Sequence, residues 1–217
     1  THTTPLFTSC CPAWVNYCEK NHPDLLKDVS TCRSPMEMFA SIIKEQNSRS
    51  SRKAMHIAIM PCTAKKFEVG REDQNAAGVP DVDVSLTVRE LGRMIKGAGI
   101  NFLSLPDEDF DMPLGISTGA AVIFGATGGV MEAALRTAVE TLTGEELEHL
   151  DFIEVRGIKG IKEATYNIDG MDINIAVASG LSNAKELLTR VESGEANYHF
   201  IEIMGCPGGC EKILNIV

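Results

Sequence analysis

The sequence predicts an α/β protein in which mostly parallel sheets are flanked by helices. Short apolar runs typical of strands alternate with amphipathic segments whose apolar residues recur every three or four positions. Two of the expected strands lead directly into a cysteine. Because α/β sheets bind their ligands at the carboxyl ends of parallel strands, the same pattern also predicts where the functional site lies.

Each expected element rests on a local signal. The strand candidates are rich in β-branched and apolar residues, and they span 56–60, 83–88, 151–155, 173–179 and 198–204. The helix candidates have helical apolar spacing and lie near 13–21, 35–47, 88–98, 128–142 and 181–192. Capping boxes are expected at two helix starts, one formed by Thr87 with Glu90 and the other by Thr143 with Glu146.

Three loop regions stand between these elements. Polar segments near 69–82 and 104–112 are expected to be insertions or hinges. Residues 115–129 read GISTGAAVIFGATGG and lead into a helix candidate. This stretch has neither a full G-x-G-x-x-G pattern nor a P-loop lysine, so we expect its glycines to serve close helix packing rather than nucleotide binding.

Composition narrows the classes of function. The chain has 217 residues, enough for one large domain or two closely packed lobes. Its 44% hydrophobic and 23% charged residues are typical of a globular protein, and it has no apolar run of the roughly 20 residues that a membrane span needs. The net charge of -10 repels a phosphate backbone. We expect no nucleic-acid partner, no membrane span and no signal peptide, with a cytoplasmic location favoured and a periplasmic one left open.

The cysteines carry the chemical signal. There are seven of them, an odd number that cannot all pair as disulfides: Cys10, Cys11, Cys18, Cys32, Cys62, Cys206 and Cys210. Three of their surroundings predict loops built around metal, at Cys10-Cys11-Pro12, at Pro61-Cys62 and at Cys206-Pro-Gly-Gly-Cys210. Four thiolates suit an iron-sulfur cubane, and burying them without metal would be costly. Zinc remains the rival occupant, although its sites usually show two close cysteine pairs.

Three segments resemble the signature segments of the iron-only (FeFe) hydrogenase catalytic domain in order and spacing. They are FTSCCPAW at 7–14, MPCTAKKFE at 60–68 and EIMGCPGGC at 202–210. The resemblance continues through STCRSPMEMF, LTVRELGRMIK and IFGATGGVMEAALRTA, so that it covers nearly the whole chain. It implies the hydrogenase large-subunit-like fold, two lobes with mostly parallel sheets flanked by helices and a cluster between them.

The resemblance also implies a cofactor and its ligands. In this family a 4Fe-4S cluster is joined to a two-iron subcluster that carries CO, cyanide and azadithiolate ligands, together called the H-cluster. By position, the cubane ligands would be Cys11, Cys62, Cys206 and Cys210, with the sulfur of Cys210 bridging to the two-iron unit. The implied reaction is the reversible oxidation of molecular hydrogen to protons and electrons.

Further positions match the family's catalytic surroundings. The resemblance makes Cys10 the proton-transfer thiol, and a thiol pKa near 8.5 suits that task. Ser30 matches the hydroxyl of the same relay. Lys65 matches the residue that contacts one cyanide ligand, a charge-assisted arrangement, and Ser34 matches the donor toward the other. Met60 and Met204 match thioethers around the two-iron unit.

The implied partners are H2, protons, maturation proteins and an external electron carrier such as ferredoxin or another iron-sulfur subunit. Residues 1–217 are expected to form the catalytic core without the family's N-terminal and C-terminal flanking segments. Cys18 and Cys32 lie outside the signature segments, so we expect both to be buried as small hydrophobic residues.

Two other functions compete with hydrogenase activity. One is a non-catalytic hydrogenase-like protein that binds only a 4Fe-4S cluster and acts in sensing or cluster assembly. A cysteine-dependent hydrolase built on Cys10 is the weaker alternative, because no motif supplies a histidine partner. Infrared bands from carbonyl and cyanide ligands would separate the enzyme from the first alternative.

Overall fold

The computed structural model describes residues 5–8, 10–49, 53–76, 78–116, 119–145, 153–154 and 159–211. The chain divides into two compact units. Unit 1 comprises residues 1–32 and 119–216, and unit 2 comprises residues 33–118 together with the last residue. Each unit is described by itself.

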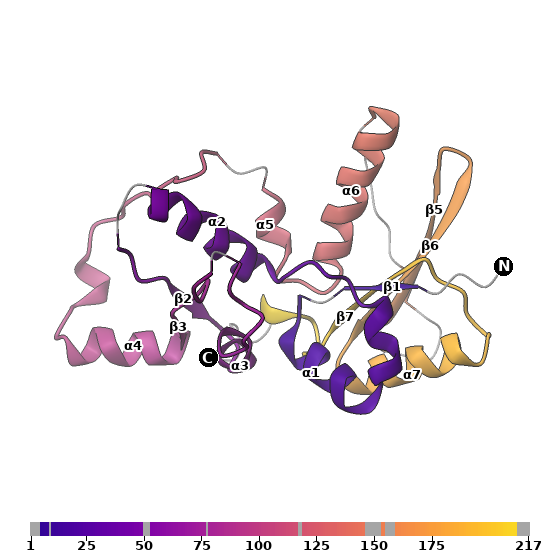
Figure 1. Ribbon diagram of the computed structural model, residues 1–217, viewed down its shortest axis with the longest axis horizontal. Helices are drawn as coiled ribbons and strands as arrows, with labels where there is room; N and C mark the ends of the chain where they lie inside the picture. Colours follow the sequence, from indigo (N-terminus) through magenta and orange to yellow (C-terminus); the bar gives the residue numbers. More distant parts are fainter. Residues whose placement is uncertain are drawn as a thin grey trace. The chain divides into compact units, whose positions relative to one another are not determined.

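Unit 1 is built on a five-stranded sheet with the order β1-β7-β6-β5-β4, of which Figure 1 labels β1, β7, β6 and β5. β1, β7 and β6 run parallel, with Phe7 beside Ile201 and Ala178 beside Ile203. β5 and β4 are added antiparallel, so the sheet is mixed. The bounds are β1 Leu6–Phe7, β4 Ile153–Glu154, β5 Ile161–Ile168, β6 Met171–Ser179 and β7 Phe200–Met204.

Helices cover both faces of this sheet because side chains along each strand alternate between the faces. Along β6, Ala176 and Ala178 join the core formed with α1 (Pro12–Asn21) and α7 (Leu181–Glu192). Ile175 and Val177 point the other way and pack against α6 (Gly129–Thr143). Fully buried Trp14 and Phe7, with ring centroids 6.1 Å apart, anchor the first core just beneath the end of β1. Unit 1 is therefore a three-layer α/β arrangement.

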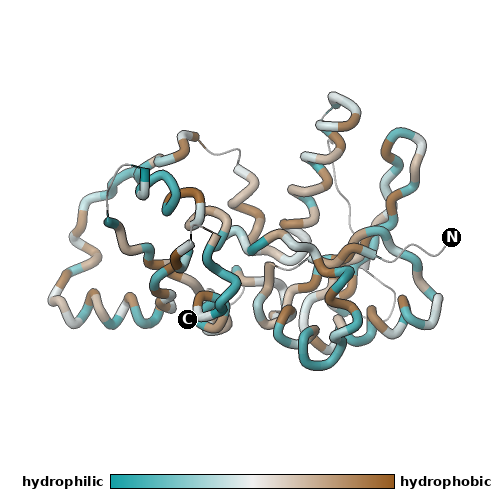
Figure 2. Tube along the Cα trace, in the orientation of Figure 1, coloured by the Kyte–Doolittle hydropathy of each residue, from teal (hydrophilic) through white to brown (hydrophobic). Residues whose placement is uncertain are grey.

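Unit 2 contains a two-stranded parallel sheet of β2 (Ile57–Met60) and β3 (Val84–Thr87). Its helices are α2 (Pro35–Arg49), α3 (Ala64–Val69) and α4 (Val88–Gly97). Polar and apolar residues alternate along α4 (Figure 2), and its start carries the predicted capping box of Thr87 and Glu90. Unit 2 also contains the short helix η2 (Phe102–Ser104), whereas η1 (Pro23–Asp28) and α5 (Ala120–Ile123) belong to unit 1.

All five predicted helices are present, and four of the five predicted strands coincide with described strands. The fifth, at 151–155, is described only at β4. Sequence reasoning missed β5, although its hairpin partner β6 follows an Asp169-Gly170 turn with positive φ at both residues, a recognised hairpin signal. Glu146 lies outside the described residues, so the second capping box is untested, and Thr143 is the last residue of α6.

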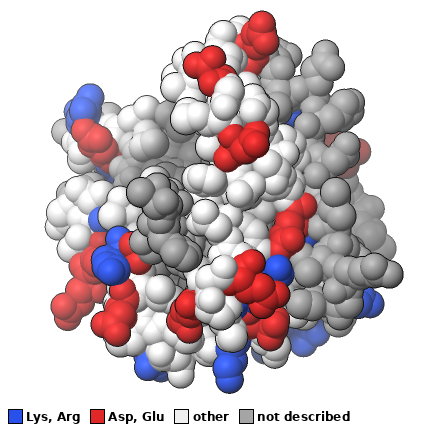
Figure 3. All heavy atoms as spheres, turned by 90° about the vertical axis from the view of Figure 1, so that its right-hand side faces the viewer, with Lys and Arg blue, Asp and Glu red and all other residues white. Residues whose placement is uncertain are grey.

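The described helices include none that is both long and apolar enough to cross a membrane. On the face drawn in Figure 3, Asp and Glu side chains are spread over the surface, with Lys or Arg beside several of them. This distribution accords with the net charge of -10.

Candidate metal centre

Two predicted cysteine segments meet at one edge of the sheet in unit 1, where its parallel strands end. β1 leads to Cys10 and Cys11, and the neighbouring parallel strand β7 leads to Cys206. The backbone amide of Gly205 donates a hydrogen bond to the sulfur of Cys11 at 3.3 Å. The predicted placement at a strand end is therefore confirmed for Cys206, and the short strand β1 before Cys10 and Cys11 was not predicted.

Ser30 lies at the same edge. Val29 forms a parallel bridge with Phe7, and the Ser30 amide donates to the Phe7 carbonyl at 2.7 Å. This bonding extends the sheet beyond β1, so Ser30 follows a strand-like segment beside the one that leads to Cys10. The Ser30 hydroxyl also accepts a hydrogen bond from the amide of Cys32 at 3.2 Å.

Cys11 is the N-cap of α1, and Pro12 occupies the first helical turn. The sulfur of Cys11 forms no capping hydrogen bond with the amides of this turn. It accepts its hydrogen bond from Gly205, just after the end of β7. A side chain at Gly205 would place its Cβ 3.3 Å from that sulfur and 3.1 Å from Ala13 Cβ, so this position has room for little beyond glycine.

The Cys206–Cys210 loop is folded tightly by its glycines. Gly208 and Gly209 have φ values of 80° and 89°, which side chains rarely adopt. The Gly208 amide donates to the Ser179 hydroxyl at 3.2 Å, which ties the loop to the end of β6. A Cβ on Gly209 would lie 2.5 Å from the Gly125 carbonyl oxygen. The cysteine loop is therefore pressed against the glycine-rich segment before α6.

That glycine-rich segment serves packing, as predicted. Gly128 is the N-cap of α6 with a φ of 95°, and a Cβ on Gly129 would lie 1.8 Å from the Ile123 carbonyl oxygen. An antiparallel bridge joins Ala126 to Gly209. The segment thus forms one wall of the cysteine loop.

Buried Glu202 holds this wall in place, and sequence reasoning missed it. Its two carboxylate oxygens accept hydrogen bonds from the amides of Gly128 and Met131, each at 2.7 Å. These are otherwise unpaired donors of the first turn of α6. Burial raises the pKa of Glu202, while the two amide hydrogen bonds act in the opposite direction. A charged residue inside the apolar strand FIEIM was the signal that could have identified it.

A cavity of about 770 Å³ lies beside the cysteine loop in unit 1. Pro207 and Gly208 line one side of it, and the segment from Ser179 to Asn183 lines another. Its size falls within the range of small-molecule sites. The cysteine loop therefore adjoins space of cofactor dimensions.

The remaining predicted residues lie in unit 2 or are buried in unit 1. Cys62 follows β2, so it too stands after a parallel strand. Lys65, on α3, is buried and pairs with Glu68 at 2.7 Å between the ammonium and a carboxylate oxygen. Ser34 is buried, Met60 is half-buried at the end of β2, and Met204 is buried at the end of β7.

The ten predicted residues are thus divided between the units. Unit 1 holds Cys10, Cys11, Ser30, Met204, Cys206 and Cys210, and unit 2 holds Ser34, Met60, Cys62 and Lys65. Among the side chains that the structure describes, no group of three or more His, Cys, Asp or Glu is arranged to hold a metal ion. The convergence of Cys11, Cys62, Cys206 and Cys210 on one cluster stays a prediction.

The donor set in unit 1 fits an iron-sulfur group. Cys11, Cys206 and Cys210 offer soft sulfur ligands from two neighbouring loops, and soft thiolates are what such clusters prefer. The Gly205 amide supplies the kind of hydrogen bond to sulfur that tunes cluster potential. The adjoining cavity is lined by Gly205, Pro207 and Gly208, the neighbours of Cys206 in this loop.

The two cysteines outside the signature segments differ from each other. Cys18 is fully buried in the core of α1 and α7, as predicted, and burial raises the pKa of its thiol. The prediction for Cys32 was wrong, since its side chain is exposed. Cys32 lies between η1 and α2, on a segment that belongs to no helix or strand.

Together, the three-layer fold and the sulfur-bearing loops at the strand ends define an α/β protein with a candidate iron-sulfur site. The family model for the iron-only hydrogenase large subunit, C-terminal domain, matches residues 1–212. The chain belongs to this family.

Relatives of two kinds are similar to the chain. It is 50% identical over 210 residues to the NADP-reducing hydrogenase subunit HndD of Solidesulfovibrio fructosivorans, covering 95% of the chain and 36% of that protein. It is 33% identical to cytosolic iron-sulfur assembly component 3 of Pongo abelii, covering 95% of the chain and 45% of that protein. The chain therefore spans less than half the length of either relative.

A solved structure agrees with the fold. A variant of the [FeFe]-hydrogenase HydA1 of Chlamydomonas reinhardtii superposes with a TM-score of 0.83 at 40% identity, covering 95% of the chain and 60% of that protein. The predicted hydrogenase-like α/β fold is confirmed by this likeness.

Proposed function

We propose that this chain is the catalytic core of an iron-only hydrogenase that reversibly oxidises molecular hydrogen to protons and electrons. Cys11, Cys62, Cys206 and Cys210 would hold the 4Fe-4S cluster, and the Cys210 sulfur would bridge it to the two-iron subcluster with its CO, cyanide and azadithiolate ligands. When bound, this group supplies the redox-active iron at which hydrogen and protons interconvert.

One observation carries the proposal. The hydrogen bond from the Gly205 amide to the Cys11 sulfur joins the first signature segment to the last, across 194 residues of sequence. A protein that used Cys10 or Cys11 alone would have no need of a second cysteine loop at that position. The family match and the similarity to HndD support hydrogen as the substrate.

The surrounding residues have separate tasks in this proposal. Cys10 exchanges a proton with the reacting group through its thiol, and Ser30 passes that proton onward. The neighbouring strand-like segments that carry Cys10 and Ser30 support such a relay. Lys65 would face one cyanide ligand with its positive charge, and Ser34 the other with its hydroxyl. Met60 and Met204 would line the two-iron pocket.

The partners follow from the same reaction. Maturation proteins would install the two-iron unit, and an external carrier such as ferredoxin, or another iron-sulfur subunit, would exchange electrons with the cubane. We propose a cytoplasmic location.

A second function is favoured by one observation. Cytosolic iron-sulfur assembly component 3 of Pongo abelii matches nearly the whole chain at 33% identity. A protein of that kind would retain the 4Fe-4S cluster for assembly or sensing without the two-iron unit.

Infrared spectroscopy tests the choice between the two functions. The full chain would be reconstituted anaerobically with iron and sulfide, matured with the azadithiolate two-iron precursor, and assayed for hydrogen release from reduced methyl viologen. Carbonyl and cyanide stretching bands together with hydrogen release would support the hydrogenase. A cubane signal without those bands or hydrogen would leave the non-catalytic protein.

A further inference from the structure

Glu37 is a buried carboxyl group with an unusual lack of partners. It lies in the first turn of α2, its exposed fraction is 0%, and neither of its side-chain oxygens has a hydrogen-bond partner among the described residues. An ionised carboxylate that has lost its water without gaining a donor is strongly disfavoured, whereas the neutral acid is far less costly to bury. Burial alone therefore favours a proton on Glu37.

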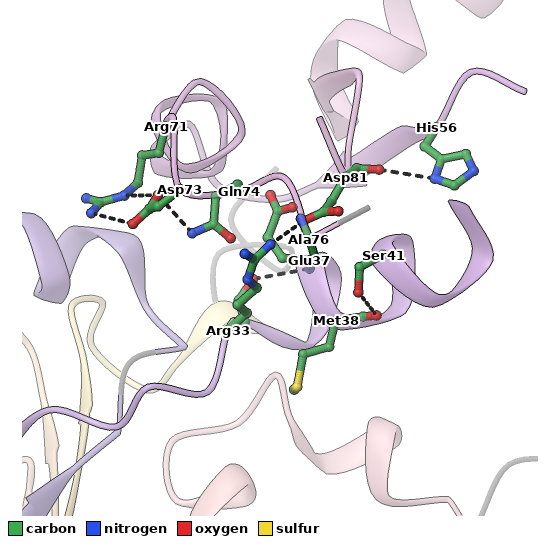
Figure 4. A network of polar contacts seen from close by, with 11 residues as sticks. Arg33, Glu37, Met38, Ser41, His56, Arg71, Asp73, Gln74, Ala76 and Asp81 are labelled. Carbon is green, nitrogen blue, oxygen red and sulfur yellow. Dashed lines mark hydrogen bonds and ion pairs between the residues drawn. The ribbon is translucent and has the colours of Figure 1, made fainter. Parts of the chain in front are cut away.

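The charges around Glu37 favour the same state. Two carboxylates, Glu68 and Asp81, and two cations, Lys65 and Arg33, act on it. Each cation already has a carboxylate partner: Lys65 pairs with Glu68 at 2.7 Å, and Arg33 pairs with Asp81. Figure 4 shows Arg33, Glu37 and Asp81 within this network.

The balance of charges around Glu37 shows that one proton is needed. With all groups ionised, three carboxylates would face two cations and leave one uncompensated negative charge in the interior of unit 2. A single proton removes it, and Glu37 is the carboxyl group that has no cation of its own. The arrangement therefore selects Glu37 as the group that binds the proton.

We propose that Glu37 is a protonated positioning residue that keeps the Lys65 ammonium paired with Glu68, and that loss of this proton makes Glu37 compete for Lys65. The consequence for the reaction rests on the proposed function, in which Lys65 faces a cyanide ligand. Burial, followed by the charges of Glu68 and Asp81, raises the pKa of Glu37 from 4.5 to about 7. The competition therefore begins near neutral pH.

The first experiment tests the proton and needs no cluster. Because the folded-state pKa of Glu37 is raised, its protonation favours the folded state below about pH 4.5, and this contribution is lost as the pH rises through 7. Urea unfolding of the full apo chain would be measured from pH 4.5 to 8.5 for wild type, Glu37→Gln and Glu45→Gln. Glu45 lies on the same helix, its side chain is 60% exposed, and it serves as the matched control.

From pH 4.5 to 8.5, the folding equilibrium constant of wild type and of Glu45→Gln should fall by up to roughly 100-fold more than that of Glu37→Gln. Glutamine has nearly the same shape as the protonated acid and does not titrate, so the variant should fold. Parallel pH profiles for wild type and Glu37→Gln would overturn the proposal.

The second experiment tests the competition for Lys65. The Lys65 ammonium nitrogen would be followed by NMR in the apo chain, with its signal assigned by its loss in Lys65→Arg. In wild type the signal should shift with a midpoint near pH 7, and in Glu37→Gln it should stay near its acidic position. An unchanged titration in Glu37→Gln would overturn the coupling. Failure of the proposed function would appear separately, as absent cyanide bands in the matured wild type.

Discussion

The amide of Gly205 donates a hydrogen bond to the sulfur of Cys11, although 194 residues separate them. The contact follows from the parallel pairing of β1 with β7, which brings the ends of both strands to one edge of the sheet. It makes the position of the Cys11 sulfur depend on the backbone that carries Cys206.

Replacing Gly205 with alanine should disturb that sulfur. The added Cβ would lie 3.1 Å from Ala13 Cβ and 3.3 Å from the sulfur, so one of these groups must shift. We expect a lower iron content after reconstitution and an altered electron paramagnetic resonance (EPR) spectrum of the cluster. The control is Gly92→Ala in α4, where a Cβ meets open space and should stabilise the fold by about 0.5–1 kcal/mol. A normal spectrum in Gly205→Ala would contradict the expectation.

Replacing Glu202 with glutamine should loosen the wall of the cysteine loop. Glutamine has one acceptor oxygen for the two amides of Gly128 and Met131, so one buried donor would lose its partner. We expect the free energy of unfolding of the apo chain to fall by about 1–3 kcal/mol, measured by urea unfolding. Glu132→Gln, at a partly exposed ion pair with Arg136 on α6, should change the free energy of unfolding by less than about 1 kcal/mol. Equal losses in both variants would contradict the role of Glu202.

Substitutions of the adjacent residues Cys10 and Cys11 should affect the cluster differently. Cys10→Ala should retain the 4Fe-4S signal and nearly abolish hydrogen release, because the proposed relay thiol is not a ligand. Cys11→Ala should lose the cluster signal itself. Exposed Cys32 provides the control, and Cys32→Ser should keep both properties. Loss of iron to the same degree in Cys10→Ala and Cys11→Ala would remove the distinction between relay and ligand.

The capping box of α4 should contribute to acid sensitivity. Hydrogen bonds from the Lys66 ammonium and from Thr87 lower the pKa of Glu90 from 4.5 to about 2. A lowered folded-state pKa stabilises the fold above about pH 4.5, and this contribution is lost as the pH falls toward 2. The stability difference between wild type and Glu90→Gln, measured by urea unfolding, should shrink from pH 6 to pH 3. A stability difference that stays constant between pH 6 and pH 3 would contradict this role of Glu90.

Local sequence signals predicted the five longest α-helices and the parallel strands β2, β3, β6 and β7, but not the short parallel strand β1. Thr87 and Glu90 satisfy each other's backbone donors within one helical turn. Such a capping box can be predicted from the local sequence because it depends on no distant residue. β5 was missed because its residues 161–168 alternate irregularly in polarity, as its mixed burial shows. Cys32 was misplaced because its exposure depends on the path of an irregular segment, which residue type does not determine.

The candidate site was predictable only in part. The order of the cysteine motifs supplied the candidate sulfurs, and the predicted strands placed Cys62 after β2 and Cys206 after β7. The contacts of Gly205 and Glu202 depend on which strands become neighbours, and the charge balance at Glu37 depends on packing among α2, α3 and the segment before β3. Such tertiary relationships leave no local pattern in a single sequence.

Cys62 offers the most direct test of the central claim, that one cubane draws its ligands from both units. Iron content and the EPR spectrum of the reduced, anaerobically reconstituted chain would be compared for wild type, Cys62→Ser and Cys32→Ser. We expect about four iron ions per chain in wild type and in Cys32→Ser, and loss of the 4Fe-4S signal in Cys62→Ser. Full iron content with an unchanged spectrum in Cys62→Ser would contradict the account.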